Sequence, residues 1–230
     1  MADSPTVVNS SEVHNPALRH HFADMEQQRE SSEFGMWVFL ITEIMFFGGM
    51  FAAYMIYRYL YYPSWAAGSE KMDFWYGTIN TVVLICSSLT MALAVHSAQV
   101  GRRKLLVTLL IITMLFGVTF LVIKGVEYHG HWVKNEFPGA GFHVEDVDAA
   151  AAVHIELFFS LYWAMTGFHA LHMLIGIGIV ALITYFSWRG KYGPDYHNPV
   201  EITGLYWHFV DLIWIYLYPL LYLISHTHKA

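Results

Sequence analysis

The chain has 230 residues, of which 56% are hydrophobic, 17% aromatic and only 13% charged. This balance is far more apolar than that of a soluble domain and indicates an integral membrane protein. A net charge of −6, with twelve Lys and Arg residues and no dense basic run, excludes nucleic acid as a partner. The single cysteine, Cys86, excludes an intrachain disulfide framework and a thiolate cluster, and we expect it to be a packing residue.

Residues 1–33 form a polar segment ahead of the first apolar stretch. They hold two prolines, end in a charged run, and lack the apolar core and small-residue cleavage site of a signal peptide. We therefore expect this segment to remain attached as a mostly flexible cytoplasmic N-terminal arm or a surface helix.

Five stretches are long enough to cross a membrane as helices. A hydrocarbon core of about 30 Å requires about 20 apolar helical residues, and the chain reaches this length at about residues 34–59, 74–96, 105–126, 155–188 and 202–224. A soluble domain of this size has no core large enough to enclose five such helices. The sequence thus predicts an all-α fold, an integral membrane five-helix bundle over residues 34–226. The fourth stretch is longer than the membrane is thick, so we expect its N-terminal end to project into water.

Positive charge in the short connections predicts the orientation. Arg102, Arg103 and Lys104 lie between the second and third stretches, and Arg189 and Lys191 lie between the fourth and fifth. By the positive-inside rule both connections face the cytoplasm, which places the N-terminus in the cytoplasm and the C-terminus in the periplasm.

The connection at residues 127–154 then faces the periplasm and is acidic near its end. We expect an ordinary solvated loop there. Contact with a basic electron donor or a neighbouring subunit is the alternative.

Two histidines lie in the middle of the fourth stretch, within GFHALH. His169 and His172 are spaced i, i+3, which places both rings on one helix face and would suit haem or a transition metal. The other stretches offer too few histidines to complete such a site. We therefore expect the imidazoles to form hydrogen bonds across helices instead.

Other ionisable groups inside the apolar stretches each allow two interpretations. Glu43 has no basic neighbour in its own helix, so it must be protonated, partnered across helices, or close to headgroups or water. His208 and Asp211, in YWHFVD, share a face on which the carboxylate would orient the imidazole, and this favours structural pairing over proton transfer. Lys124 and Glu127 are spaced i, i+3 and either pair or reach the membrane interface, which favours an anchoring role.

Five segments, in order along the chain, resemble the signatures of one family: GMWVFLITEIMFFGGMFAAY, NTVVLICSS, VIKGVEY, MTGFHALHMLIG and EITGLYWHFVDLIWIYLYPLLY. They are similar to successive segments of haem-copper oxidase subunit III, the cytochrome c oxidase subunit III family, over about residues 34–222. The strings GFHxLH and YWHFVDxxW are far more specific than a single intramembrane histidine. The chain resembles the shorter, five-helix bacterial form, since only the polar arm stands where the longer form has two further helices.

The resemblance implies an accessory subunit with no redox cofactor and no active site of its own. It would pack mainly against subunit I, with subunit II and other oxidase subunits, in a proton-pumping cytochrome c oxidase of a bacterial cytoplasmic (inner) membrane. Haem and copper would lie in the partner subunits. The resemblance also implies bound phospholipid, support of sustained turnover, and delivery of protons and oxygen to subunit I, with cytochrome c or a larger supercomplex as further partners.

We expect a set of polar residues to be lipid-facing or structural, and none of them to be catalytic, cofactor-binding or metal-binding: Glu43, Asn80, His96, Glu127, His169, His172, Glu201, Trp207, His208 and Asp211. Because the two further helices of the longer form are missing, its lipid cleft is not assumed here.

Several alternatives remain open from the sequence. Subunit III of a quinol oxidase and the related accessory protein of nitric oxide reductase share the same fold family. A small transporter or channel, with Glu43, His169 and Asp211 lining a polar path, is disfavoured because no inverted repeat or pair of broken helices is evident. A membrane cytochrome that uses the two histidines of the fourth stretch is a further alternative.

Overall fold

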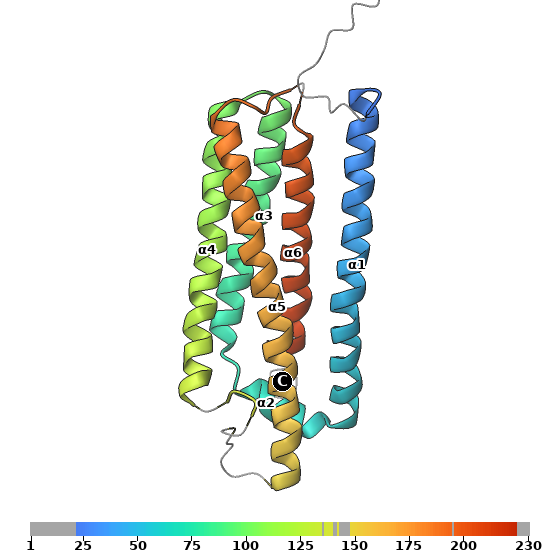
Figure 1. Ribbon diagram of the computed structural model, residues 1–230. Coiled ribbons are helices and arrows are strands. Elements are labelled where there is room, and N and C mark those ends of the chain that lie inside the picture. Colours follow the sequence, from blue (N-terminus) through green and yellow to red (C-terminus); the bar gives the residue numbers. More distant parts are fainter. Residues whose placement is uncertain (1–21, 135, 140–141, 143–147, 195, 225–230) are drawn as a thin grey trace, which may run out of the picture.

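The structure is a computed structural model and describes residues 22–134, 136–139, 142, 148–194 and 196–224. These residues contain six helices and no β-strand. The helices are α1 (Met25–Leu60), α2 (Tyr62–Glu70), α3 (Phe74–Gln99), α4 (Arg103–Val133), α5 (Ala149–Trp188) and α6 (Asn198–Tyr222). In Figure 1 the long helices run alongside one another, and the short α2 lies across one end of the bundle.

Four helical segments are long and apolar enough to cross a membrane, namely α1, α3, α4 and residues Ala151–Trp188 of α5. α6 lies among these helices (Figure 1) and has 25 residues, but it falls outside this set. It is less apolar because it is rich in Tyr and Trp and also carries Glu201, His208 and Asp211. The all-helical fold is therefore confirmed, whereas the count of five spans stays a prediction.

α1 begins at Met25, earlier than the expected start at residue 34. The Asp24 side chain accepts a hydrogen bond of 2.7 Å from the backbone N–H of Gln27 and so caps the helix. Arg29 and Glu33, one turn apart, form an exposed ion pair of 3.2 Å on the added turns. The last part of the expected arm is thus helical, and residues 1–21 lie outside the described residues.

The connection between α4 and α5 is shorter than expected, because α4 continues to Val133 and α5 begins at Ala149. The first turns of α5 extend past the ends of the neighbouring helices (Figure 1). The acidic residues expected in this connection at positions 145 and 146 lie outside the described residues.

The sequence pattern did not predict α2. Its Trp65 is fully buried, with ring centroids 5.9 Å from Tyr54 of α1 and 5.8 Å from Phe158 of α5. Ser69 donates a hydrogen bond of 2.8 Å to the carbonyl of Leu221, near the end of α6. α2 therefore closes this end of the bundle and satisfies a carbonyl that the end of α6 leaves unpaired.

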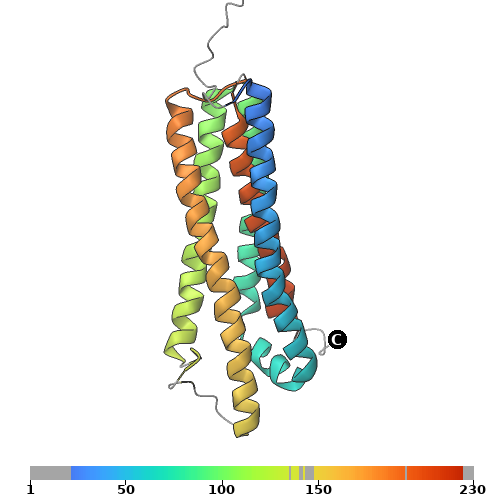
Figure 2. The same cartoon turned by 45° about the vertical axis from the view of Figure 1, so that its right-hand side comes forward.

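The connections that carry the positive charges lie together at the opposite end of the bundle (Figure 2). Gly101 (φ 77°) turns the chain between α3 and α4, and Gly190 (φ 79°) turns it between α5 and α6, a conformation in which glycine avoids strain. Arg103 spans the two turns, because its Nε donates a 3.0 Å hydrogen bond to the carbonyl of Ser187 at the end of α5. The charged guanidinium there also complements the helix dipole.

α3, α4, α5 and α6 form the core, and α1 stands at its edge. Only 11% of the most apolar window of α1 is buried against the rest of the chain, compared with 28–33% for the other three candidate spans. Near its C-terminal end α1 is held by Tyr54, whose hydroxyl donates to the carbonyl of Leu220 in α6. Most of α1 therefore presents apolar side chains to its surroundings.

Candidate functional site

The intramembrane carboxyl of α1 meets a histidine of α5. Glu43 Oε2 lies 3.1 Å from His172 Nε2, and the two side chains are 18% and 15% exposed. The other ring nitrogen of His172 lies 2.7 Å from the carbonyl oxygen of Phe168, which only accepts, so this nitrogen carries a hydrogen. One proton is then shared between Nε2 and the carboxyl, and the pair is electrically neutral whichever atom holds it.

This pair lines an open groove of about 560 Å³ between α1, α5 and α6. Apart from Glu43, His172, Thr203 and Tyr206, the lining is aliphatic or aromatic: Met36, Phe39, Ile175, Ile179 and Ile202. A mostly apolar channel with a few polar groups is the usual form of a site for a ligand with an apolar body.

Two more grooves follow α1 where it faces α6. One, of about 300 Å³, is entirely lined by apolar and aromatic residues, including Phe47, Phe51 and Tyr216. The other, of about 380 Å³, reaches α3 and contains Glu33, Glu201 and His208. α1 is thus flanked by grooves along much of its length, which agrees with its small buried fraction.

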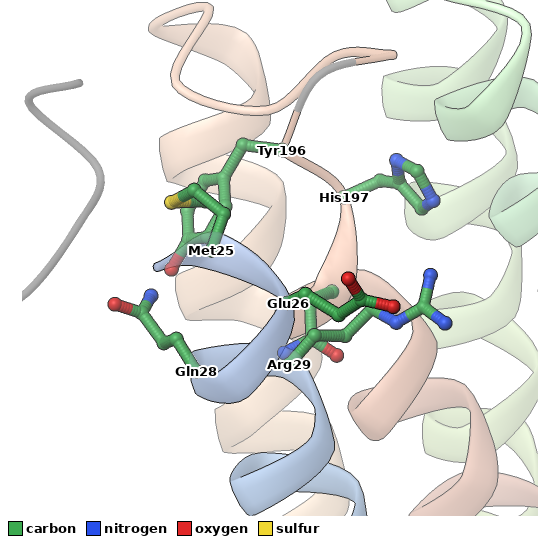
Figure 3. Close-up of a pocket in the computed structure, with 7 residues that line it drawn as sticks. Met25, Glu26, Gln28, Arg29, Tyr196 and His197 are labelled. Atoms are coloured by element: carbon green, nitrogen blue, oxygen red, sulfur yellow. The ribbon is translucent and has the colours of Figure 1, made fainter. Parts of the chain in front are cut away.

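A polar pocket of about 250 Å³ lies where α1 and α6 begin. Figure 3 shows Glu26 and Arg29 of α1 next to the segment that carries Tyr196 and His197. His197 Nε2 also lies 3.4 Å from Glu201, within the first turn of α6. None of the pocket's lining residues belongs to the set of expected site residues.

α3 and α6 are joined by a row of side-chain hydrogen bonds. Trp207 Nε1 donates to Ser87 Oγ at 2.9 Å, and His208 Nδ1 lies 2.7 Å from Ser88 Oγ. His208 is therefore oriented by Ser88, not by Asp211 as the sequence analysis favoured. Both carboxyl oxygens of Asp211 are buried and have no hydrogen-bond partner among the described residues.

The pairing of Lys124 with Glu127 is correct, but the anchoring role at the membrane interface is wrong. Lys124 Nζ lies 3.0 Å from Glu127 Oε2, and both side chains are only 2% exposed. Tyr162 of α5 and Tyr222 of α6 each donate a hydroxyl hydrogen bond to Glu127 Oε1, at 2.7 and 2.5 Å. Their rings and that of Trp214 also surround the ammonium at about 5 Å. The pair thus joins three helices inside the core.

A second cluster ties the chain after α4 to α2. Glu136 Oε2 lies 2.6 Å from His131 Nδ1, and Glu136 Oε1 lies 3.3 Å from Lys71 Nζ. Burial alone would raise the pKa of Glu136, but the hydrogen bond and charge of His131 and the charge of Lys71 outweigh it and hold the pKa below its usual range.

The remaining expected residues are scattered. Asn80 and His169 are fully buried and have no side-chain hydrogen-bond partner among the described residues. His96 is exposed in the last turn of α3, and Glu201 accepts a 2.6 Å hydrogen bond from Gln99. The structure therefore brings together Glu43 with His172, and Glu201 with His208 in one groove, but it does not gather the whole set.

The two histidines of GFHALH do not share a site. His169 packs its ring against Phe120 and Trp214 in the core, with ring centroids 5.4 and 5.3 Å apart, whereas His172 faces Glu43 in the groove. Among the described residues, no group of three or more His, Cys, Asp or Glu side chains could hold a metal ion. The i, i+3 spacing thus does not aim both rings at one ligand here.

Sequence reasoning missed the partners that complete these sites, namely Ser88, Tyr162 and Tyr222. The sequence pattern singles out neither tyrosine. The one clue in the sequence is that each tyrosine places a hydroxyl on an apolar helix, where that hydroxyl needs a hydrogen-bond partner. The pairing itself depends on how the helices pack.

The comparisons with known proteins agree on one family. A sequence profile described as "Cytochrome c oxidase subunit III" matches residues 20–226. The chain is similar to proteins named cytochrome c oxidase subunit 3 from Thermostichus vulcanus and from Synechocystis sp., at 33% identity over 83% of this chain and 86% and 75% of those relatives. It is also similar to the protein of that name from Dugong dugon, at 30% identity over 82% of this chain and 68% of that relative.

Proposed function

The chain belongs to the cytochrome c oxidase subunit III family, and we propose that it is the accessory, non-redox subunit III of a proton-pumping haem-copper oxidase. It packs against the catalytic subunit I, and the haem and copper of the complex lie in its partner subunits. Relatives from cyanobacteria support a location in a bacterial cytoplasmic membrane. Their names favour cytochrome c over quinol as the electron donor.

In this proposal α6 is the fifth membrane span. It lies between the four candidate spans and shares buried hydrogen bonds with α3 and α4, so a bilayer that holds its neighbours also holds α6. The charged connections between α3 and α4 and between α5 and α6 lie at the end where α1 begins (Figure 1). By the positive-inside rule, the positive charge of these two connections supports a cytoplasmic N-terminus and, with five spans, a periplasmic C-terminus.

The observation that carries the accessory role is the set of apolar grooves along α1. An acyl chain of a phospholipid fits a long apolar groove, and the neutral Glu43–His172 pair supplies one polar contact beside it. Phospholipid held there fills the gap between α1 and the core. The same apolar grooves offer dissolved oxygen a route from the bilayer toward subunit I.

Purification of the assembly that contains this chain tests the proposal. Mild detergent extraction should yield a complex with a haem-copper subunit I, a haem absorption spectrum and oxygen uptake with reduced cytochrome c. Uptake with quinol instead would assign the chain to a quinol oxidase. Isolation of the chain alone, without haem or oxidase activity, would overturn the proposal in favour of a transporter.

A further inference from the structure

One buried carboxyl plays no part in the contacts that hold the bundle together. Asp211 of α6 is 3% exposed, and neither of its oxygens has a hydrogen-bond partner among the described residues. No ion pair found in the described part of the chain includes it. An isolated carboxylate in such surroundings is strongly disfavoured, so the carboxyl holds a proton.

Next to this carboxyl lies a hydroxyl that is already hydrogen-bonded to an imidazole. Ser88 of α3 faces Asp211, and its Oγ lies 2.7 Å from Nδ1 of His208, one turn before Asp211 on α6. Because the Ser88 hydroxyl is the side-chain group that interacts with the Asp211 carboxyl, it is the acceptor available to the Asp211 O–H. The three groups then form a continuous hydrogen-bonded chain.

α3 and α6, which carry these three side chains, are held in register by further hydrogen bonds. Trp207 donates to Ser87 at 2.9 Å, and Trp214 donates to Thr81 at 3.1 Å, so two indole hydrogen bonds connect α6 to α3, one on each side of Asp211. The spacing between Ser88 and the two α6 side chains is therefore fixed by buried contacts on both sides.

His208, at one end of this hydrogen-bonded series of side chains, lines a groove. His208 lines the groove of about 380 Å³ between α1, α3 and α6, together with Glu33 of α1 and Glu201 of α6. The Glu43–His172 pair of α1 and α5 belongs to a different groove. Glu33 and Glu201 are the other ionisable residues that line the groove of His208.

We propose that Asp211 is a proton-holding carboxyl that exchanges its proton with this groove through Ser88 and His208. The Asp211 O–H gives its proton to Ser88 Oγ while the Ser88 O–H passes its own proton to His208 Nδ1. His208 then releases the proton on Nε2 to water in the groove, beside Glu33 and Glu201. Asp211 becomes a carboxylate, one proton appears in the groove, and the reverse sequence reloads the carboxyl.

This exchange would give the subunit a proton store at the groove that opens toward the start of α1. Its use in proton delivery rests on the proposed function, because only an oxidase partner consumes the proton. The exchange itself depends on the three side chains alone and is measurable in whatever assembly contains the full chain.

Infrared spectroscopy of the purified assembly tests the proposal. The spectrum of the wild-type protein minus that of Asp211→Asn should show the C=O stretching band of a protonated carboxyl, and this band should shift in D₂O as the proton is replaced by deuterium. Ser88→Ala should slow that shift by about tenfold or more, the effect of removing one hydrogen-bonded step. Ser88→Thr, which keeps the hydroxyl, should restore the wild-type rate.

Ser97→Ala is the matched control, because it removes a buried hydroxyl of α3 that bonds to the Leu93 carbonyl of its own helix and lies outside the transfer path. It should exchange at the wild-type rate. His208→Gln reads the next step independently if Ser88→Ala fails to fold. Absence of the band, or equal exchange in Ser88→Ala and Ser97→Ala, overturns the relay even if the protein co-purifies with an oxidase. Loss of the oxidase partner overturns only the proposed function.

Discussion

Removal of the charge of Lys124 should be among the most destabilising single changes in the chain. Lys124→Met keeps a long apolar stem but leaves Glu127 buried without its cation. At an effective dielectric constant of about 20, unit charges separated by the observed 3.0 Å attract by roughly 5.5 kcal/mol. Truncation of one partner of a buried ion pair costs about 3–5 kcal/mol, so the two estimates agree.

The free energy of unfolding can be measured in mixed micelles titrated with sodium dodecyl sulfate, with tryptophan fluorescence as the signal. Lys124→Met should lose about 3–5 kcal/mol. Lys124→Met combined with Glu127→Gln should lose less than the sum of the two single changes, because no unpaired charge remains in the core. Lys71→Met is the control: Lys71 is 32% exposed, and its ion pair with Glu136 should contribute less than about 1 kcal/mol.

Two results would refute this reasoning. One is a Lys124→Met protein whose stability lies within about 1 kcal/mol of the wild type, the range of an exposed pair. The other is strict additivity in the double variant, which would mean that Lys124 and Glu127 do not act on each other.

Three further changes have defined outcomes. Glu43→Ala should leave haem and copper content intact but lower the phospholipid retained per complex and shorten activity under turnover; loss of haem from subunit I would contradict this. The pKa of Glu136 is lowered in the folded protein. The carboxylate therefore stabilises the fold above the ordinary glutamate pKa of about 4.3, and this contribution is lost as the pH falls through the folded-state pKa. Glu136→Gln should flatten the acid dependence of the free energy of unfolding. Gly117→Ala should cost about 1–3 kcal/mol, because the new Cβ would lie 2.9 Å from the ring of Trp207, whereas Gly125→Ala, with open space, should unfold like the wild type.

The sequence was sufficient to predict the long helices because α1, α3, α4 and α5 each carry an apolar run of membrane length, and α6 carries a less apolar run of similar length. It was insufficient for α2, which has nine residues and no apolar run long enough to be recognised. α2 is held by contacts with other helices, chiefly the packing of Trp65 against Tyr54 of α1 and Phe158 of α5, which no local pattern reveals.

The same limit applies to the polar residues. Spacing alone related Lys124 to Glu127, since i, i+3 neighbours must face the same way on any helix. Spacing also suggested that Asp211 orients His208. In the structure, the imidazole is hydrogen-bonded to Ser88 of α3 instead. Glu43 could be assigned a partner on another helix in principle, yet only the packing of α1 against α5 identifies it as His172.

The pairing of Glu43 with His172 also constrains how the protein is made. The two residues are 129 positions apart in the chain, so α1 leaves the ribosome well before its partner on α5 exists. During that interval we expect α1 to stay beside the insertion machinery or in lipid with its carboxyl protonated, while α3 and α4 assemble without it. Crosslinking of stalled nascent chains of increasing length should detect contact between α1 and α5 only after His172 has entered the bilayer; earlier contact would show that α1 docks by another route. Of the described helices, α1 is made before α3 and α4 and would then join the fold after them.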